Sequence, residues 1–214
     1  MPRWRMIVDL RKCIGCGICT EVCEQFNRLP PGAKWRKLIE YENKGNPRLP
    51  RIYITMSCMH CNRAPCLDVC PTQATYRRDD GIVDINLELC LGCGACITAC
   101  PYQARSIATQ DVMRFKTEET EDADNALYSD RIGVCTKCHF CRERIDRGIA
   151  RGLKPGIDPD ATPICVRYCI ADAIYFGDVD DPESEIAHFI RDNKVIGLLE
   201  ELNTEVSVLY ILED

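Results

Sequence analysis

The amino-acid sequence predicts an α+β fold of two lobes, built from duplicated small modules and joined by long loops. Three observations predict it. All but one of the 17 cysteines in this 214-residue chain fall into four groups of four with short spacings. Strand-like apolar triplets precede two of the groups, and similar five-residue segments follow three of them. Internal repetition of this kind is typical of duplicated modules.

The first and third cysteine groups share one spacing, C-x2-C-x2-C-x3-C. Bacterial ferredoxins use this spacing to hold 4Fe-4S clusters, because three thiolates bind one cluster and the fourth binds its neighbour. Glycines stand between the cysteines of both groups, where a tight loop needs positive φ angles. The two groups are Cys13, Cys16, Cys19, Cys23 and Cys90, Cys93, Cys96, Cys100.

The second and fourth groups are variants of the same pattern. Structural zinc sites also use C-x2-C pairs, but the third cysteine of a ferredoxin run has no role in them, so the four groups predict four 4Fe-4S clusters. Spacing alone does not decide whether Cys135 or Cys141 joins Cys138 in the fourth group. The second group is Cys58, Cys61, Cys66, Cys70, and the fourth ends in Cys165 and Cys169.

The segments around the groups repeat as well. Val8-Asp9-Leu10 precedes the first group and Val83-Asp84-Ile85 precedes the third. Three groups run into similar segments, residues 70–74, 100–104 and 169–173, each with alanine at its end. We therefore expect each unit to be a short strand, a cluster loop, a helix of one or two turns and a return strand.

The composition argues against some classes of partner and favours metal binding over disulfide bonds for the thiols. The net charge of −6 gives no reason to expect a nucleic-acid partner. The sequence has no run of about 18 apolar residues, so we expect no membrane span. The first residues lack an apolar signal segment, so we expect the chain to start in the cytosol, where disulfide frameworks are rare. An odd cysteine count also fits disulfides poorly, which favours metal binding.

Two segments near the fourth group carry a family resemblance. Residues 138–148 read CHFCRERIDRG and residues 176–182 read FGDVDDP. Together with the order of the four groups, they resemble the iron–sulfur subunit of the DMSO reductase (molybdopterin oxidoreductase) family, which includes the polysulfide, arsenate and formate dehydrogenase types. The resemblance runs from about residue 6 to residue 182.

The register of this resemblance bears on the fourth group. In the resembling family the C-x2-C pair stands at a fixed spacing from the positions of Arg144, Asp146 and Gly148. This spacing favours Cys138 and Cys141 as ligands, which leaves Cys135 as a spare or alternative ligand. The segment from residue 142 to residue 164 is about twice as long as is usual in the family. Its glycines and prolines indicate a helix followed by an ordered surface loop, either a partner contact or a tolerated insertion.

The resemblance also implies which groups share a lobe, the first with the fourth and the second with the third. Residues 1–56 and 130–182 would form the first lobe and residues 57–110 the second. Residues 111–129 would be an acidic connector, and residues 183–214 a C-terminal helix and strand for docking. The implied ligand sets are Cys13, Cys16, Cys19 with Cys169; Cys138, Cys141, Cys165 with Cys23; Cys58, Cys61, Cys66 with Cys100; and Cys90, Cys93, Cys96 with Cys70.

The function that the resemblance implies is that of an electron-transfer subunit with no catalytic site of its own. Its partners would be a large catalytic subunit with molybdenum or tungsten bis-pterin and a membrane-anchor, quinone-reactive or other electron-acceptor subunit. The chain would be cytoplasmic by default and membrane-associated through a partner, or periplasmic by co-export with a signal-bearing subunit. The alternatives are a free-standing polyferredoxin and a zinc-stapled interaction module.

Several other residues and segments have expected roles. His60 and His139 lie in cluster loops, where we expect hydrogen bonding or exposure rather than iron ligation, because every ligand place already has a cysteine. Residues 30–50 suggest a strand pair or an interface loop, and a helix capped by Ser184 or Asp181 is expected before a strand at 206–212. The cations that either tune cluster potentials or lie at the surface are Lys12, Arg63, Arg142 and Arg144.

Overall fold

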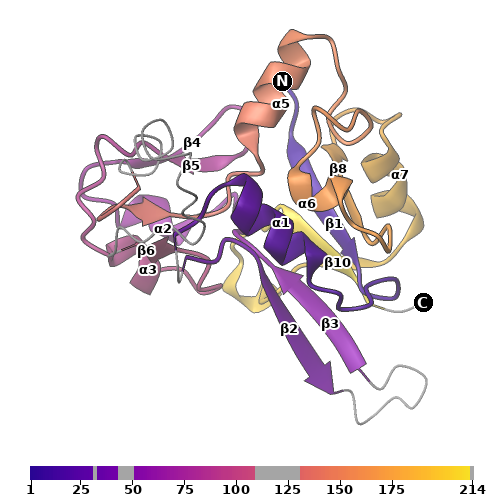
Figure 1. Cartoon of the computed structure of the whole chain (residues 1–214), viewed down its shortest axis with the longest axis horizontal. Coiled ribbons are helices and arrows are strands. Elements are labelled where there is room, and N and C mark those ends of the chain that lie inside the picture. Colours follow the sequence, from indigo (N-terminus) through magenta and orange to yellow (C-terminus); the bar gives the residue numbers. More distant parts are fainter. Residues whose placement is uncertain (31–32, 43–50, 109–130, 213–214) are drawn as a thin grey trace, which may run out of the picture.

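The computed structural model describes residues 1–30, 33–42, 51–108 and 131–212. Short helices and strands are mixed along the chain, which confirms the α+β class. Figure 1 shows two lobes, one around β1, β8 and β10 and the other around β4, β5, α2 and α3, with α1 between them. The acidic connector expected at 111–129 lies outside the described residues. Across the described part of the chain, every helix is too short or too polar to cross a bilayer.

The first lobe is organised by a four-stranded sheet. Its central strand β1 (Trp4–Asp9) runs antiparallel to β8 (Ile174–Asp178) and parallel to β10 (Val208–Ile211), which in turn pairs with β9 (Val195–Ile196). Helices α1 (Ile18–Phe26) and α6 (Ile164–Arg167) pack against each other. Because β1 leads into the first cysteine group and β8 leaves the fourth, this sheet brings the two groups together.

The second lobe has smaller sheets. Strand β4 (Thr75–Arg77) pairs with β5 (Val83–Ile85), and helix α2 (Pro65–Asp68) packs against α3 (Ala95–Thr98). Strand β6 (Ser106–Ile107) pairs with β7 (Cys135–Thr136). Because of this pairing, Cys135 and Thr136 lie beside β6 of the second lobe.

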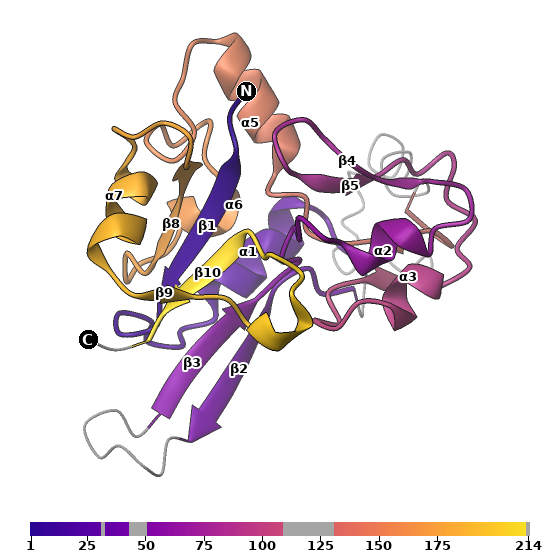
Figure 2. The ribbon, with the colours of Figure 1, turned by 180° about the vertical axis from the view of Figure 1, so that it is seen from behind.

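A hairpin projects from the body of the protein. Strands β2 (Lys37–Glu42) and β3 (Arg51–Met56) are antiparallel, which confirms the expected strand pair. Both views show the hairpin extending away from the two lobes (Figures 1 and 2). It reaches the first cysteine group, because Tyr53 of β3 packs on the loop at Gly15. The last part of the segment 30–50, residues 43–50, lies outside the described residues.

The long segment after Cys141 is an ordered part of the first lobe. It forms α5 (Arg142–Ala150) and then a loop that folds back on this helix. The Thr162 hydroxyl accepts a hydrogen bond from the Gly156 N–H at 2.8 Å and donates one to the Asp158 carbonyl at 2.8 Å. A Cβ atom at Gly148 would lie 2.3 Å from the Ala161 Cβ, so only glycine allows this close packing.

The C-terminal segment is integrated into the first lobe. Helix α7 (Glu185–Asp192) begins as expected at Ser184, whose hydroxyl accepts the Ala187 N–H at 3.2 Å. A 3-10 turn, η1 (Glu200–Leu202), precedes β10. The predicted strand exists, but it is buried between β1 and β9. Residues 183–212 thus contribute a helix and the buried strand β10 to the first lobe.

The repeated sequence segments form one repeated turn. Gln73, Gln103 and Asp172 all have positive φ angles, between 45° and 54°. Their N–H groups donate to the carbonyls of the cysteines three residues earlier, at 3.1, 3.1 and 3.2 Å. The alanines that follow, at positions 74, 104 and 173, are buried. The similarity seen in the sequence is therefore a similarity of backbone conformation, with a small side chain where space is short.

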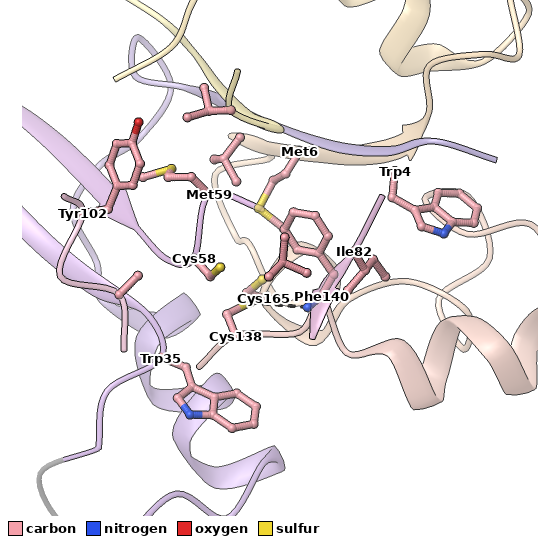
Figure 3. Packing of buried hydrophobic residues seen from close by; sticks show 14 of the residues in the cluster. Trp4, Met6, Trp35, Cys58, Met59, Ile82, Tyr102, Cys138, Phe140 and Cys165 are labelled. Carbon is pink, nitrogen blue, oxygen red and sulfur yellow. Dashed lines mark hydrogen bonds between the residues drawn. The ribbon is translucent and has the colours of Figure 1, made fainter. Parts of the chain in front are cut away.

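The core combines apolar side chains with cysteines. Met6, Phe140 and Tyr210 are almost completely buried, and Phe140 contacts Phe176 edge to face with ring centroids 5.3 Å apart. Figure 3 shows Cys58, Cys138 and Cys165 gathered beside Met6 and Phe140 at the centre of this cluster. The thiols thus lie inside the hydrophobic core where the two lobes meet.

Candidate metal centres

Four sets of cysteines come together, and we name them sites A to D. Site A lies in the first lobe, where the loop before α1 and the turn before β8 line a small cavity. Gly17 caps α1 with a φ of 76° and lets the loop curl around this cavity. The cysteines of site A are Cys13, Cys16, Cys19 and Cys169.

Site D is the counterpart of site A in the second lobe. It also has a small cavity lined by cysteines, and Gly94 caps α3 with a φ of 77°. This near-identity of loop, cap and cavity matches the shared cysteine spacing of the first and third groups. The cysteines lining the cavity are Cys70, Cys90, Cys93 and Cys96, together with Cys135.

Sites B and C lie deeper in the protein. In site B, Cys23 is close to Cys138, Cys165 and Cys141; burial first, and then these neighbouring thiols, raise the pKa of Cys23 well above its usual value. In site C, burial raises the pKa of Cys61 to about 12, with further contributions from Cys58, Cys66 and Cys100. Thiols with such raised pKa values become thiolates only when a cation or metal stabilises the charge.

The surroundings of the thiols suit iron–sulfur clusters. Backbone N–H groups donate to sulfur at 3.3 Å from Ala173 to Cys169, at 3.4 Å from Thr75 to Cys70 and at 3.5 Å from Phe140 to Cys138. Soft thiolate ligands and hydrogen bonds to sulfur are typical of such clusters. In the described ranges no three His, Cys, Asp or Glu side chains gather as they would around a single ion. The thiols of sites A and D instead surround a cavity, as they would around a cluster rather than a single ion.

Exposure differs between the outer and inner sites. Cys16 of site A and Cys93 of site D are exposed, whereas every cysteine of sites B and C is buried except the half-buried Cys100. Cys165 of site B acts on the pKa of Cys19 in site A, and Cys58 of site C acts on that of Cys138 in site B. Arg105 reaches both the Cys66 sulfur of site C and the Cys135 sulfur beside site D. The four sites therefore follow one another in the order A, B, C, D.

Cys135 lies at site D and not with the rest of the fourth group. Its thiol is 3.4 Å from the Cys96 thiol, and its N–H donates to the Cys90 sulfur at 3.4 Å. The pairing of β7 with β6 holds it there. The structure thus brings Cys23 to Cys138, Cys141 and Cys165 and places Cys135 beside the third group.

Three buried cations near the thiols escaped the sequence analysis. Arg36, Lys137 and Arg105 are only 2%, 3% and 5% exposed. Burial alone would lower the pKa of Arg36 and Arg105, but neighbouring thiols raise both above the usual value. Burial lowers the pKa of Lys137, although nearby thiols act in the opposite direction. One signal was present in the sequence, because Arg105 occupies the place in its repeat where Thr75 and Ile174 stand in the others.

The other expected side chains have ordinary structural roles. His60 and His139 are buried, and their Nδ1 atoms accept hydrogen bonds from the N–H groups of Val83 at 3.1 Å and Arg142 at 3.2 Å. Hydrogen bonding, one of the two expected outcomes, therefore holds for both. Arg63 pairs with Glu205 at the surface. The remaining cations near the groups also bind protein groups: Lys12 the Tyr175 hydroxyl, Arg142 the Asp84 carboxylate, and Arg144 the Thr162 carbonyl.

Comparison with known proteins places the chain in a family. Two family models described as 4Fe-4S dicluster domains match residues 12–74 and 50–122. Over 98% of its length the chain is 38% identical to the B subunit of the selenate reductase of Mesobacillus selenatarsenatis, of which it covers 72%. It is 34% identical to the B subunit of the tetrathionate reductase of Salmonella typhimurium over 90% of its length, covering 64% of that protein. It is 30% identical to the arsenate respiratory reductase iron-sulfur subunit of a Shewanella species over 98% of its length, covering 96% of that protein.

These relatives are iron–sulfur or B subunits of reductases, and two dicluster domains account for four clusters. An electron-transfer role without a catalytic site of its own follows from this kinship. The chain belongs to the family of iron–sulfur subunits of molybdopterin oxidoreductases, which carry four 4Fe-4S clusters.

Proposed function

We propose that sixteen of the cysteines are cluster ligands, four at each of sites A to D. Each lobe is then a dicluster module that arose by duplication, and in each module the last cysteine of one motif crosses to the neighbouring site. Cys23 supports this assignment, because it belongs to the motif whose other cysteines line site A, yet it lies in α1 among the thiols of site B. Cys135 is the cysteine left without a ligand role, since site D already has four others.

The assigned sites form a relay for electrons through the protein. Its partners are a catalytic subunit with molybdenum or tungsten bis-pterin and a membrane quinone-reactive or other redox subunit. The single observation that carries this proposal is the exposure pattern, in which two buried sites lie between two sites with exposed cysteines. A protein that only stored electrons would need no cluster near its surface. A relay, by contrast, must exchange electrons with a partner at each end.

Each exposed end has an apolar rim suited to a protein partner. At site A, Ile14 is 60% exposed and Ile170 is exposed nearby in the chain segment after Cys169; at site D, Leu91 is 73% exposed. Ile14 and Leu91 occupy the same place in the repeat, directly after the first cysteine of their motifs. Exposed apolar side chains beside a redox centre are typical of a docking surface that excludes water.

Membrane association, in this proposal, comes through a partner subunit. The relatives named above belong to reductases, among them a tetrathionate reductase and an arsenate respiratory reductase. A membrane-anchor subunit would bind one end of the relay and the catalytic subunit the other. The same arrangement works on either side of the membrane, since a signal-bearing partner can carry the folded pair across.

The test uses the complex purified through a tag on this chain. Ile14→Glu and Leu91→Glu place a charge beside sites A and D, and Ile157→Glu is the matched control, because Ile157 is 67% exposed on the loop after α5. We expect the first two variants to keep all their iron and each to lose a different partner, while the control keeps both. Recovery of the unsubstituted chain alone, loaded with iron, would instead favour a free-standing polyferredoxin.

A further inference from the structure

We propose that Arg36, Lys137 and Arg105 are fixed positive charges placed between successive sites, where they raise the reduction potentials of the clusters on either side. The inference rests on the ligand assignment proposed above. It adds a group of residues that act on the clusters without binding them, one for each step of the relay from A to D.

Arg36 lies between sites A and B. One end of its guanidinium donates to the Cys165 sulfur of site B at 3.5 Å and to the Met6 sulfur at 3.4 Å. The other end donates to the Thr55 hydroxyl at 2.8 Å, which fixes the orientation of the group. The charge also acts on Cys19 of site A. Arg36 therefore contacts one site and faces the other.

Arg105 has the equivalent place between sites C and D. Its guanidinium donates to the Cys66 sulfur of site C at 3.0 Å and to the Thr75 hydroxyl at 3.1 Å. It also approaches Cys135 at 3.8 Å, and its charge acts on Cys96 of site D. Each lobe thus has one buried arginine, held by a threonine hydroxyl and donating to a cysteine sulfur.

Lys137 occupies the remaining interval, between sites B and C. Its ammonium donates to the Cys138 carbonyl at 2.9 Å and to the Val83 carbonyl, and so links the loop of site B to β5 of the second lobe. Its nearest thiols are Cys58 and Cys66 of site C and Cys138 of site B. It lies where the relay passes from one lobe to the other.

Within the described part of the chain, none of the three cations forms an ion pair with a carboxylate. A buried charge without a counter-charge is costly, so an anion is needed close by. The acidic groups that favour the charged form of these cations are cysteine thiols, joined at Arg36 by the Tyr210 hydroxyl. Clusters held by four thiolates carry net negative charge, and reduction adds one more; a nearby cation in a medium of low dielectric constant favours the reduced form.

The test removes the charges one at a time in the purified complex. The variants are Arg36→Gln, Lys137→Met and Arg105→Gln, and each cluster potential is followed by EPR-monitored redox titration. We expect the reduced-to-oxidised ratio at fixed potential to fall about tenfold at the two flanking sites, a shift of about 59 mV for one electron. The pattern identifies the residue: A and B for Arg36, B and C for Lys137, C and D for Arg105.

Lys12 provides the matched control. It precedes Cys13 as Lys137 precedes Cys138, but it is exposed to solvent. Because water screens an exposed charge, Lys12→Met should change the reduced-to-oxidised ratio at each site by no more than about twofold. Potentials that stay unchanged in the three buried variants, or that shift equally at all four sites, would overturn the proposal.

Charge-retaining variants separate charge from shape if a neutral variant loses iron. Arg36→Lys, Arg105→Lys and Lys137→Arg keep the positive charge and alter the hydrogen bonds. Retained iron and nearly unchanged potentials in these variants, beside iron loss in the neutral ones, would show that the charge is what the sites require. Equal iron loss in both sets would show a role in packing alone and would refute the proposal. If the iron content were normal but other cysteines bound the iron, the ligand assignment would be refuted instead.

Discussion

The thiol of Cys135 lies 3.4 Å from the thiol of Cys96, although the two residues belong to different cysteine groups. Their contact holds the pKa of Cys96 low, at about 6, and raises that of Cys135. If Cys96 binds iron as a thiolate, only Cys135 has a proton to donate across this contact. Cys135 would then act as a hydrogen-bond donor to a ligand of site D.

We therefore predict that Cys135→Ser and Cys135→Ala keep about sixteen iron per chain, four for each of four clusters. Serine can still donate to the Cys96 sulfur, so the reduction potential of site D in Cys135→Ser should stay near that of the unsubstituted protein. Alanine cannot, and the site D potential should fall. Iron analysis and EPR-monitored titration measure both effects. Loss of about four iron from Cys135→Ser would make Cys135 a ligand; Cys96→Ser, which removes an assigned ligand, is the positive control for such a loss.

Tyr210 shows how the C-terminal strand is fixed to the rest of the first lobe. Its hydroxyl donates to the Thr55 carbonyl of β3 at 3.0 Å, and its side chain is completely buried. Tyr210→Phe leaves that carbonyl without this donor, which should cost about 1 kcal/mol and lower the apparent Tm by about 2–4 °C. Tyr168→Phe is the control, because Tyr168 is exposed. Equal Tm values for the two variants would contradict a stabilising role for this hydrogen bond.

The loop after α5 should be sensitive to one added methyl group. Gly156 has a φ of +93°, and a Cβ atom there would lie 1.9 Å from the Phe176 carbonyl oxygen of β8. Gly156→Ala should therefore destabilise the first lobe by at least about 3 kcal/mol. Gly152→Ala, at a φ of +76° with no atom within 4 Å, should cost only about 1 kcal/mol. Thermal unfolding scans at one heating rate compare them; a similar Tm for both would mean that the loop is not packed on β8 as described.

Local patterns predicted local structure well. The spacing around Cys13 and Cys90 indicated the cluster loops, and Ser184 indicated the start of α7. The repeat that ends at Ala74, Ala104 and Ala173 indicated duplicated units, and the structure adds that these segments share one turn, whose conformation depends on a few adjacent residues. Such features are encoded by neighbouring residues and can be recognised in one sequence.

Contacts between distant segments could not be predicted in the same way. Nothing in the residues of β10 indicates that it lies parallel to β1, about 200 residues away in the sequence. Cys135 is three residues from Cys138, yet strand pairing takes it to the other lobe. In the sequence Arg36 resembles an ordinary surface cation, but the fold buries it. In each case the position depends on which segments pack together, and a single chain contains no local signal for that.

Iron removal should unfold the two lobes to different extents. The second lobe depends on two-stranded sheets of two or three residue pairs, which have little stability of their own. The first lobe has a four-stranded sheet and the buried strands β1 and β10. Because metal binding supplies folding free energy, anaerobic extraction of iron with a chelator should unfold the second lobe first.

Amide hydrogen exchange can resolve this difference in the full-length chain. Val83 and Ile85 of β5 should lose their protection on extraction, while Ile7 and Val8 of β1 keep part of theirs. Both pairs are buried and lie in strands, so exposure in the loaded protein does not favour either. Reloading with iron and sulfide should restore protection in β5, which controls for irreversible damage. If β1 and β5 lost protection together, the clusters would hold the two lobes as one cooperative unit, and the stability assigned to the four-stranded sheet would be wrong.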